Sequence, residues 1–348
     1  MKKVTIIGAT GFGGIGLIEL ILRHPNFALN QIIAQKDVAK PLSHLYPHLK
    51  GFCDKRIESL NDLDYKSTDL VFMSTPDQVG MNLISKFYNL KIPVIDFSGD
   101  FRFKKISDYK IYAKNKGMKP GHSSKDLLKN TVYGLPEKYK KQIKKSLIIG
   151  NPGCFAIGMI LALLPAIEAD FITSDTIICN GITGVSGAGK NSGEKNLYPQ
   201  RYENINSYKE GKHQHLVEVE QIINSLSSKT KKILFIPHLA PISRGIFNTI
   251  IVDFKPNLTL KRITDYYRDY YKNDPFVILS QESLDSNSVR GSNRCALNLK
   301  IDKRTKKLII TSVIDNLMKG QAGNALQNAN LVFDFEETLG LNNPPVYP

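Results

Sequence analysis

One cysteine lies where a strand, a turn and a helix meet. The apolar run 147–149 stops at the Gly-Asn-Pro-Gly turn 150–153. Cys154 comes next, and the apolar segment 155–164 behind it has the length of a helix that is ended or kinked at Pro165. The unpartnered N–H groups and the dipole at a helix start favour a thiolate over a thiol. The position therefore predicts a nucleophile at Cys154, and the alternative is a small buried side chain.

Two histidines and a glutamate follow in a pattern that suits a thiol nucleophile. His215 and Glu218 are three residues apart at the start of an amphipathic segment, so on a helix the carboxylate could orient the imidazole. His213 would point elsewhere. A cysteine nucleophile needs a proton partner, so one of the two histidines is predicted to be the acid/base. His-x-His spacing also suits a metal, but no further ligand cluster accompanies it, and no metal is predicted.

Two glycine-rich segments predict anion binding. The strand-like run 4–7 leads into 8–14, with its G-x-x-G-x-x-G spacing, and then into the apolar helical face of 15–22. That order binds a pyrophosphate at a helix N-terminus. A second loop, 184–190, follows the predicted strand 176–183 and can wrap an anion with backbone N–H groups, although the loop taken alone favours a flexible turn.

The end of the second strand bears on the choice of nucleotide. NAD-selective enzymes usually place Asp or Glu there to hold the ribose 2′-hydroxyl. After 31–34 this chain has Gln35 and Lys36. A cation suits a 2′-phosphate, so NADP is predicted, with an ordinary exposed lysine as the alternative.

Composition limits the class of protein. A chain of 348 residues predicts two domains, and it has no uninterrupted apolar membrane span. The four cysteines are scattered, which argues against a disulfide framework or a zinc cluster. The apolar run at 4–7 ends at once in a glycine-rich turn, so a β-strand explains it better than a signal peptide, and the cytoplasm is predicted. The net charge of +15 is dispersed and not interleaved with aromatics, so no nucleic acid is predicted. A basic chain does suit an anionic substrate and cofactor.

These features require an α/β chain with two kinds of sheet. Strands and helices alternate in the first part, which predicts a Rossmann-type parallel sheet with Ser98 at its carboxyl edge. The Lys-rich stretch 103–143 is predicted to be irregular, with no chemistry. The expected strands are 4–7, 31–34, 69–73, 92–97 and 147–149, with a helix over 78–88.

After Cys154 the longer strands predict an α+β second domain with a mixed or antiparallel sheet, which could pair subunits as a homodimer or homotetramer. The predicted domains are 1–150 with 316–348, binding NADP, and 151–315, for catalysis and dimerisation. The expected strands are 176–183, 232–236, 245–254, 294–301 and 307–314, with helices from about 215 to 226, over 259–271 and from 315 to about 333, the last packing on the first domain.

Six motifs in order resemble the N-acetyl-gamma-glutamyl-phosphate reductase family, within the semialdehyde dehydrogenase superfamily. The resemblance covers nearly the whole chain. The motifs are Gly8-Ala9-Thr10-Gly11-Phe12-Gly13-Gly14, Gly150-Asn151-Pro152-Gly153-Cys154, Gly184-Val185-Ser186-Gly187-Ala188-Gly189, His213-Gln214-His215, Pro237-His238-Leu239-Ala240-Pro241 with Arg244-Gly245, and Asp315-Asn316-Leu317-Met318-Lys319-Gly320.

The resemblance implies a chemistry and a set of site residues. Cys154 would attack a γ-acyl phosphate to form a thioester, which NADPH would reduce to N-acetylglutamate 5-semialdehyde in arginine biosynthesis. The family pattern favours His215 over His213 as acid/base, with Glu218 orienting it. The cofactor residues are Gly8, Thr10, Gly11, Phe12, Gly13, Gly14, Lys36, Ser98, Gly187, Asn316 and Gly320. The substrate residues are Asn151, Ser186, Lys190, Tyr208 and Arg244.

Three alternatives remain open. The first is a reductase of another amino-acid acyl phosphate, aspartyl or aminoadipyl; the His-x-His motif disfavours aspartyl more than aminoadipyl. The second is a thiol acyltransferase or hydrolase without hydride transfer, against which the N-terminal glycine turn argues. The third is a non-catalytic NADP-binding regulatory protein, which the combination of Cys154 with a histidine and an acid argues against.

Overall fold

The computed structural model describes residues 1–190 and 193–347, which form two compact units. The first consists of Met1–Tyr109, Gly121–Pro152 and Gln321–Asn342. The second consists of Lys110–Pro120, Gly153–Gly320 and the chain from Asn343 onward. The nucleotide-binding and catalytic roles assigned to the two domains stay predictions.

The first unit is built on a six-stranded, entirely parallel sheet with the order β2-β1-β3-β4-β6-β5. All four residues of β3 are buried, as expected for a parallel sheet covered on both faces. From β1 the chain goes outward to β2 and returns to β3 on the other side of β1, and ligands bind at such a reversal. The strands are β1 (Lys2–Ile7), β2 (Phe27–Ile33), β3 (Leu70–Met73), β4 (Val94–Asp96), β5 (Thr131–Tyr133) and β6 (Ile148–Gly150).

Helices of this unit pack around the sheet, and α10 contacts α1, α5 and β4. The buried residues of α10 include amides as well as apolar side chains: Asn324 and Asn328 both donate to the carbonyl of Gly134, at 2.7 and 2.9 Å. The helices are α1 (Phe12–Ile21), α2 (Leu42–Leu45), α3 (Ile84–Asn89), α4 (Ile106–Asn115), whose end belongs to the second unit, α5 (Pro136–Ile143) and α10 (Gly323–Val332), with short 3₁₀ turns at Pro47–Leu49, Leu60–Asp62, Gly80–Asn82 and Lys125–Asn130.

The prediction that 103–143 is irregular is wrong. This stretch contains α4, a 3₁₀ turn, the edge strand β5 and α5. A strand of three residues is too short to show an alternating pattern, and the abundant lysines hide the apolar positions of the two helices. The expected helix over 78–88 is also shorter, since a 3₁₀ turn at Gly80–Asn82 precedes α3.

The second unit is built on a seven-stranded mixed sheet with the order β11-β12-β13-β10-β7-β9-β8. The central β13, β10 and β7 are antiparallel, whereas β7 pairs with β9 in parallel. Both parts of the predicted fold class are therefore confirmed. The strands are β7 (Thr176–Thr183), β8 (Asn206–Ser207), β9 (Lys232–Leu239), β10 (Ile246–Asp253), β11 (Val277–Leu279), β12 (Cys295–Asp302) and β13 (Lys307–Ile314).

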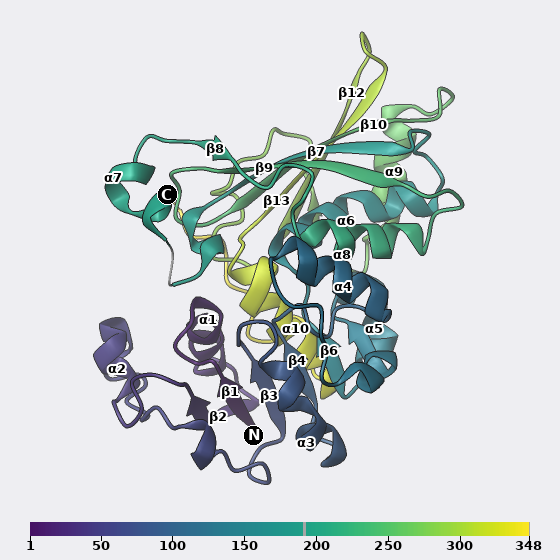
Figure 1. The fold of residues 1–348 in the computed structure, drawn as a ribbon. Helices are drawn as coiled ribbons and strands as arrows, with labels where there is room; N and C mark the ends of the chain where they lie inside the picture. Colours follow the sequence, from purple (N-terminus) through teal and green to yellow (C-terminus); the bar gives the residue numbers. More distant parts are fainter. Residues whose placement is uncertain (191–192, 348) are drawn as a thin grey trace. The chain divides into compact units, whose positions relative to one another are not determined.

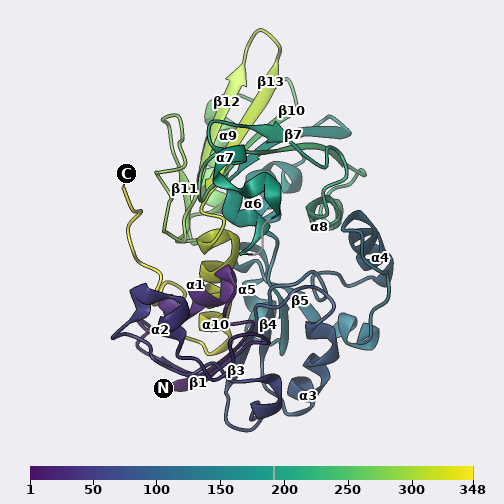
Figure 2. The ribbon, with the colours of Figure 1, turned by 60° about the vertical axis from the view of Figure 1, so that its left-hand side comes forward.

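Three helices cover one face of this sheet (Figure 1), and the β12–β13 hairpin extends from it (Figure 2). The three helices are α6 (Cys154–Glu168), α8 (His215–Asn224) and α9 (Leu260–Tyr270). The shorter elements are α7 (Tyr198–Arg201) and 3₁₀ turns at Val185–Ala188 and Glu194–Asn196. A π-helical turn at Met318–Ala322 begins in the second unit and ends in the first. Within the described parts of the chain, no helix is both long and apolar enough to cross a bilayer.

Helix α6 continues past Pro165 to Glu168, so an end at Pro165 is wrong. Proline lacks the N–H that would bond to the carbonyl four residues earlier. Here that carbonyl, on Leu161, accepts the hydroxyl of Tyr271 at 2.5 Å, and the next one, on Ala162, accepts that of Tyr267 at 2.7 Å. The hydroxyl of Tyr271, the residue after α9, thus satisfies the one carbonyl that the proline deprives of its helical donor, and the Tyr267 hydroxyl adds a bond to the next carbonyl.

Candidate active site

Cys154 is the first residue of α6 and is partly exposed. The helix has no side-chain cap at Gly153. Instead the backbone N–H of Gly153 donates to Oε2 of Glu218 on α8 at 2.9 Å, and Glu218 is fully buried. A carboxylate at a helix N-terminus is stabilised by the N–H groups and by the dipole. The predicted nucleophile and the predicted acid therefore meet at one helix end.

His215 lies against the backbone that precedes Cys154. A methyl group on Gly153 would come within 2.3 Å of Nε2 of His215, which means that the imidazole occupies the space beside that glycine. Because only glycine leaves this space, the residue before Cys154 determines how closely the imidazole can approach. The catalytic roles of both residues stay predictions.

His213 occupies a different environment, although it is only two residues away. It is 3% exposed, and its ring lies 4.7 to 5.9 Å from those of Phe155, Tyr208, His215 and Phe235. Its Nδ1 accepts the backbone N–H of His215 at 3.2 Å. Burial, and then the nearby charges of His215, Lys209 and Lys116, lower the pKa of His213 to about 2. A histidine that is neutral at every physiological pH is a poor acid, which favours His215 for that role.

Two further titratable groups, one near Cys154 and one near His213, have shifted pKa values. Burial, and after it the charge of Cys154, raise the pKa of the Tyr208 phenol, so the hydroxyl stays protonated and can donate. Burial, and after it the charge of Lys209, lower the pKa of Lys116 to about 8, while Glu218 acts in the opposite direction. Sequence analysis missed Lys116 because it lies in the Lys-rich stretch, whose segment Lys110–Pro120 joins the second unit.

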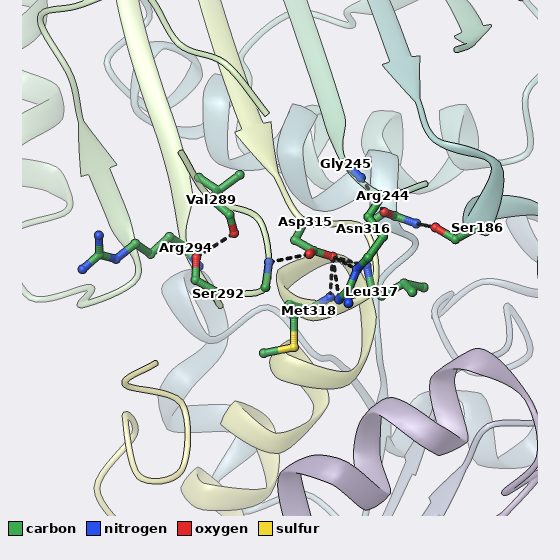
Figure 3. A network of polar contacts seen from close by, with 11 residues as sticks. Ser186, Arg244, Gly245, Val289, Ser292, Arg294, Asp315, Asn316, Leu317 and Met318 are labelled. Atoms are coloured by element: carbon green, nitrogen blue, oxygen red, sulfur yellow. Dashed lines mark hydrogen bonds and ion pairs between the residues drawn. The ribbon is translucent and has the colours of Figure 1, made fainter. Parts of the chain in front are cut away.

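The predicted substrate residues Arg244 and Ser186 meet on the motif that follows β13 (Figure 3). Nε and Nη2 of Arg244 donate to Oδ1 of Asp315 at 3.3 and 3.1 Å. Asn316 donates to Oγ of Ser186 at 2.9 Å and accepts the N–H of Gly245 at 2.7 Å. The amide of Asn316, predicted to contact the cofactor, is thus engaged within the second unit.

The other predicted residues of the second unit differ in their surroundings. Gly320 is close to it, since a methyl group there would come within 2.8 Å of Cβ of Cys154. Gly187 is exposed on the 3₁₀ turn Val185–Ala188. Lys190 is exposed and adjoins 191–192, which lie outside the described residues.

Four of the predicted cofactor glycines lie in the first unit: Gly8 and Gly11 between β1 and α1, and Gly13 and Gly14 in the first turn of α1. Gly8 has φ +87°, and a side chain there would meet the carbonyl of Ser74 at 2.2 Å. Side chains on Gly13 and Gly14 would collide within 2.6 Å, whereas Gly11 has no neighbour closer than 3.7 Å. Gly11 caps α1 without a side-chain bond, so the first N–H groups of the helix are presented at an open glycine. This is the arrangement that a pyrophosphate requires.

The remaining predicted residues of this unit are less uniform. Thr10 and Phe12 are partly exposed in the same turn, and Lys36 is exposed just after β2. Ser98 is buried and donates to Oδ2 of Asp96 at 2.5 Å. Asn151, predicted with the substrate residues, belongs to this unit, where its buried amide donates to the carbonyl of Gln321 at 3.1 Å.

Sequence analysis also missed a pair of buried carboxyl groups next to Ser98. Burial and then the charge of Asp100 raise the pKa of Asp96 to about 7, and burial likewise raises the pKa of Asp100. No group of three or more His, Cys, Asp or Glu side chains that could hold a metal occurs among residues 1–190 and 193–347.

Two domain models match successive parts of the chain. Residues 3–146 match the semialdehyde dehydrogenase NAD binding domain, and residues 154–316 match the semialdehyde dehydrogenase dimerisation domain. The fold agrees: aspartate semialdehyde dehydrogenase II of Vibrio cholerae superposes with a TM-score of 0.72 at 16% identity, over 96% of this chain and 98% of that one. The structure of aspartate semialdehyde dehydrogenase with NADP from Candida albicans superposes with a TM-score of 0.68 at 16% identity, over 96% of this chain and 98% of that one.

Curated relatives with higher sequence identity identify the family more narrowly than the domain models do. N-acetyl-gamma-glutamyl-phosphate reductases from Bacillus cereus and Bacillus anthracis are each 39% identical over 351 residues, which is 99% of both chains. The same enzyme of Bacillus mycoides is 38% identical over 99% of this chain and 100% of its own. This chain belongs to the N-acetyl-gamma-glutamyl-phosphate reductase family.

We expect Gly153→Ala to disrupt the site without unfolding the protein. The new methyl group would displace the His215 imidazole, which lies 2.3 Å from the ideal Cβ position. If that imidazole promotes the thiolate, alkylation of Cys154 by iodoacetamide at neutral pH should slow by about tenfold. Mass spectrometry reports the alkylated peptide, and Gly193→Ala is the control, because among the described residues no heavy atom beyond its own chain neighbours lies within 4 Å of its Cβ position. An unchanged alkylation rate would contradict this prediction.

A second prediction concerns acid stability. His213 has a folded-state pKa of about 2, below its ordinary value of 6.5. Only the unfolded chain binds this proton between those values, so stability should fall as pH drops below 6.5, by about 1.4 kcal/mol per pH unit at most. Urea unfolding of wild type and His213→Gln at about pH 7.5 and about pH 5 measures the difference. The variant should lose less stability on acidification, whereas the exposed-site control His44→Gln should match wild type.

Proposed function

We propose that this protein reduces N-acetyl-γ-glutamyl phosphate to N-acetylglutamate 5-semialdehyde and phosphate with NADPH, in arginine biosynthesis. Relatives that carry the reductase name along 99% of the chain support the substrate. The observation that carries the chemistry is the meeting of the Cys154 helix start with the His215 imidazole and the Glu218 carboxylate. Thiol, base and buried acid are the groups that acyl transfer through a thioester needs.

The first half of the reaction is acyl transfer. His215 takes the proton of the thiol, and Sγ of Cys154 attacks the acyl carbon. The carbon–oxygen bond to phosphate breaks, and phosphate leaves with the electron pair, so that a thioester remains on Cys154. Glu218, held by the N–H of Gly153, supplies a negative charge that favours the imidazolium formed in this step.

The second half returns the proton. NADPH, when bound, supplies the hydride that reduces the thioester carbon. The former carbonyl oxygen of the thioester, now negative, takes a proton from His215. As the carbon–sulfur bond breaks, this hydroxyl returns the proton to His215. Cys154 leaves as a thiolate, with Tyr208 as a protonated donor nearby, and the aldehyde is released.

The anionic groups of the substrate are proposed to bind at side chains on and beside the loop 184–190. Arg244, Ser186 and Lys190 are the proposed ligands of the phosphate or the substrate carboxylate, with Asn151 and Tyr208 as further substrate residues. Arg244 keeps a side-chain exposure of 32% while it bonds Asp315, so the side chain remains accessible to a ligand.

The turn between β1 and α1 fits the nucleotide. Gly8, Gly11, Gly13 and Gly14, with Thr10 and Phe12, would hold the pyrophosphate at the start of α1, because the glycines pack too closely for side chains or leave the N–H groups open. Lys36 would hold the 2′-phosphate of NADP. Contacts from Ser98, Gly187, Asn316 and Gly320 stay predictions, as does the cytoplasmic location, which the four free cysteines favour.

The reverse reaction tests this function. Protein, NADP and phosphate are mixed with N-acetylglutamate semialdehyde, and NADPH is followed by absorbance. We expect phosphate-dependent NADPH formation that disappears in Cys154→Ser, because a serine hydroxyl does not ionise as the thiol does and is a weaker nucleophile. A stronger signal with aspartate semialdehyde would assign the protein to another branch of acyl phosphates. NADP binding without any reduction would contradict the proposal.

We also propose a homodimer, or a homotetramer built from it, through the face of the seven-stranded sheet opposite α6, α8 and α9. That face also carries apolar residues of β7, β9 and β10. Among them, Ile178 on β7 pairs with Leu234 on β9, and their exposed fractions are 38% and 46%. A sheet that is apolar on both faces needs a cover on each. The match of 154–316 to a dimerisation domain supports a second copy as that cover.

Charge on this face should dissociate the assembly. Ile178→Lys combined with Leu234→Lys would place ammonium groups in the buried interface, which is costly. Light scattering after gel filtration should give at least twice the mass of one chain for wild type and the mass of one chain for the double variant. Leu22→Lys, which charges an exposed leucine of the first unit, should leave the mass unchanged. A wild-type protein with the mass of one chain would overturn the proposal.

A further inference from the structure

We propose that Asp315 is a positioning residue of this site. Its buried carboxylate orients Arg244 toward an anionic group of the substrate, and its backbone closes the turn that brings Gly320 against Cys154. The proposal deepens the function proposed above and rests on it for the role of Arg244.

The Asp315 side chain is fully buried and accepts hydrogen bonds from five donors (Figure 3). Oδ1 receives the two from Arg244, together with the N–H groups of Leu317 at 2.8 Å and Met318 at 3.1 Å. Oδ2 receives the N–H of Gly291 at 2.7 Å. A buried carboxylate is tolerated when it is paired and hydrogen-bonded on each oxygen, as it is here.

The carboxylate holds only one side of the guanidinium. Nε and Nη2 of Arg244 are engaged by Asp315, and the structure gives Nη1 no hydrogen-bond partner among residues 1–190 and 193–347. The side chain is 32% exposed. An arginine oriented by a buried acid and open at another nitrogen is suited to bind a phosphate or carboxylate, because its fork is already fixed before the ligand arrives.

The backbone of the same residue connects this arginine to the thiol. The N–H of Gly320 donates to the carbonyl of Asp315 at 2.9 Å, which closes the turn. A side chain on Gly320 would meet Cβ of Cys154 at 2.8 Å, so the closed turn forms one wall of the thiol site. The neighbouring Asn316 bonds Ser186, which adds a second predicted substrate residue to this connection.

A purely structural carboxylate is the competing explanation. It would affect the melting temperature but neither substrate affinity nor thiol reactivity. Asp315→Asn separates the two explanations, since the amide keeps the shape but removes the charge. It also turns an NH₂ group toward Arg244 and the N–H groups of Leu317 and Met318, or toward the N–H of Gly291, so some donors lose their acceptor.

The experiment compares wild type, Asp315→Asn, Asp315→Glu and the control Asp253→Asn, which removes an ion pair with Lys307 on the same sheet. The KM values for phosphate and semialdehyde are measured in the reverse reaction, together with the rate of Cys154 alkylation by iodoacetamide and the melting temperature. In Asp315→Asn we expect one KM to rise about tenfold and the alkylation rate to change severalfold. In Asp253→Asn both should stay within about twofold of wild type.

A coupling test isolates the role of Arg244. Once Arg244 is replaced by Gln, adding Asp315→Asn should raise the KM much less than it does in the wild-type background, because the group that Asp315 orients is gone. Wild-type KM values and alkylation rate in Asp315→Asn would overturn the proposal. If that variant does not fold, Asp315→Glu, which keeps the charge but moves it, replaces it with the same expectations. The alkylation rate needs no substrate, so it still tests Asp315 if the proposed reaction fails.

Discussion

The site depends on one steric constraint: two backbone positions next to Cys154 in space, Gly153 and Gly320, must carry no side chain. At Gly153 the missing Cβ leaves room for the His215 imidazole, and at Gly320 it leaves room for Cys154 itself. Both are steric conditions that no other residue meets without moving its neighbours. The thiol can therefore lie at a helix start and still have an imidazole on one side and a closed backbone turn on the other.

Buried carboxylates hold this arrangement in place. Glu218 anchors the N-cap residue of α6, and Asp315 anchors Arg244 and the turn that ends at Gly320. Each is fully buried, and each accepts from backbone N–H groups that would otherwise lack an acceptor. His213 complements them: aromatic rings enclose it, burial lowers its pKa, and its Nδ1 accepts the backbone N–H of His215.

Much of the fold could be predicted because its signals are local. The turn between β1 and α1 appears as glycines between an apolar strand and an apolar helix, and the long strands of the second unit alternate over eight residues. The prediction failed where the signal was short or cancelled. β5 has three residues, and α4 and α5 are rich in lysine. Pro165 was expected to end or kink a helix that in fact continues to Glu168, and the Tyr271 hydroxyl bonds the carbonyl of Leu161 from another element.

The sequence by itself determined the helix start at Cys154, the three-residue spacing of His215 and Glu218, and the glycine turn between β1 and α1. Each depends on neighbours within one turn or one helix, where spacing alone decides which groups meet. Only the tertiary structure decided that Glu218 bonds Gly153, that Arg244 and Gly291 converge on Asp315, and that Lys110–Pro120 joins the second unit. These contacts join residues far apart in the chain, and the packing of whole elements, which no local pattern records, brings them together.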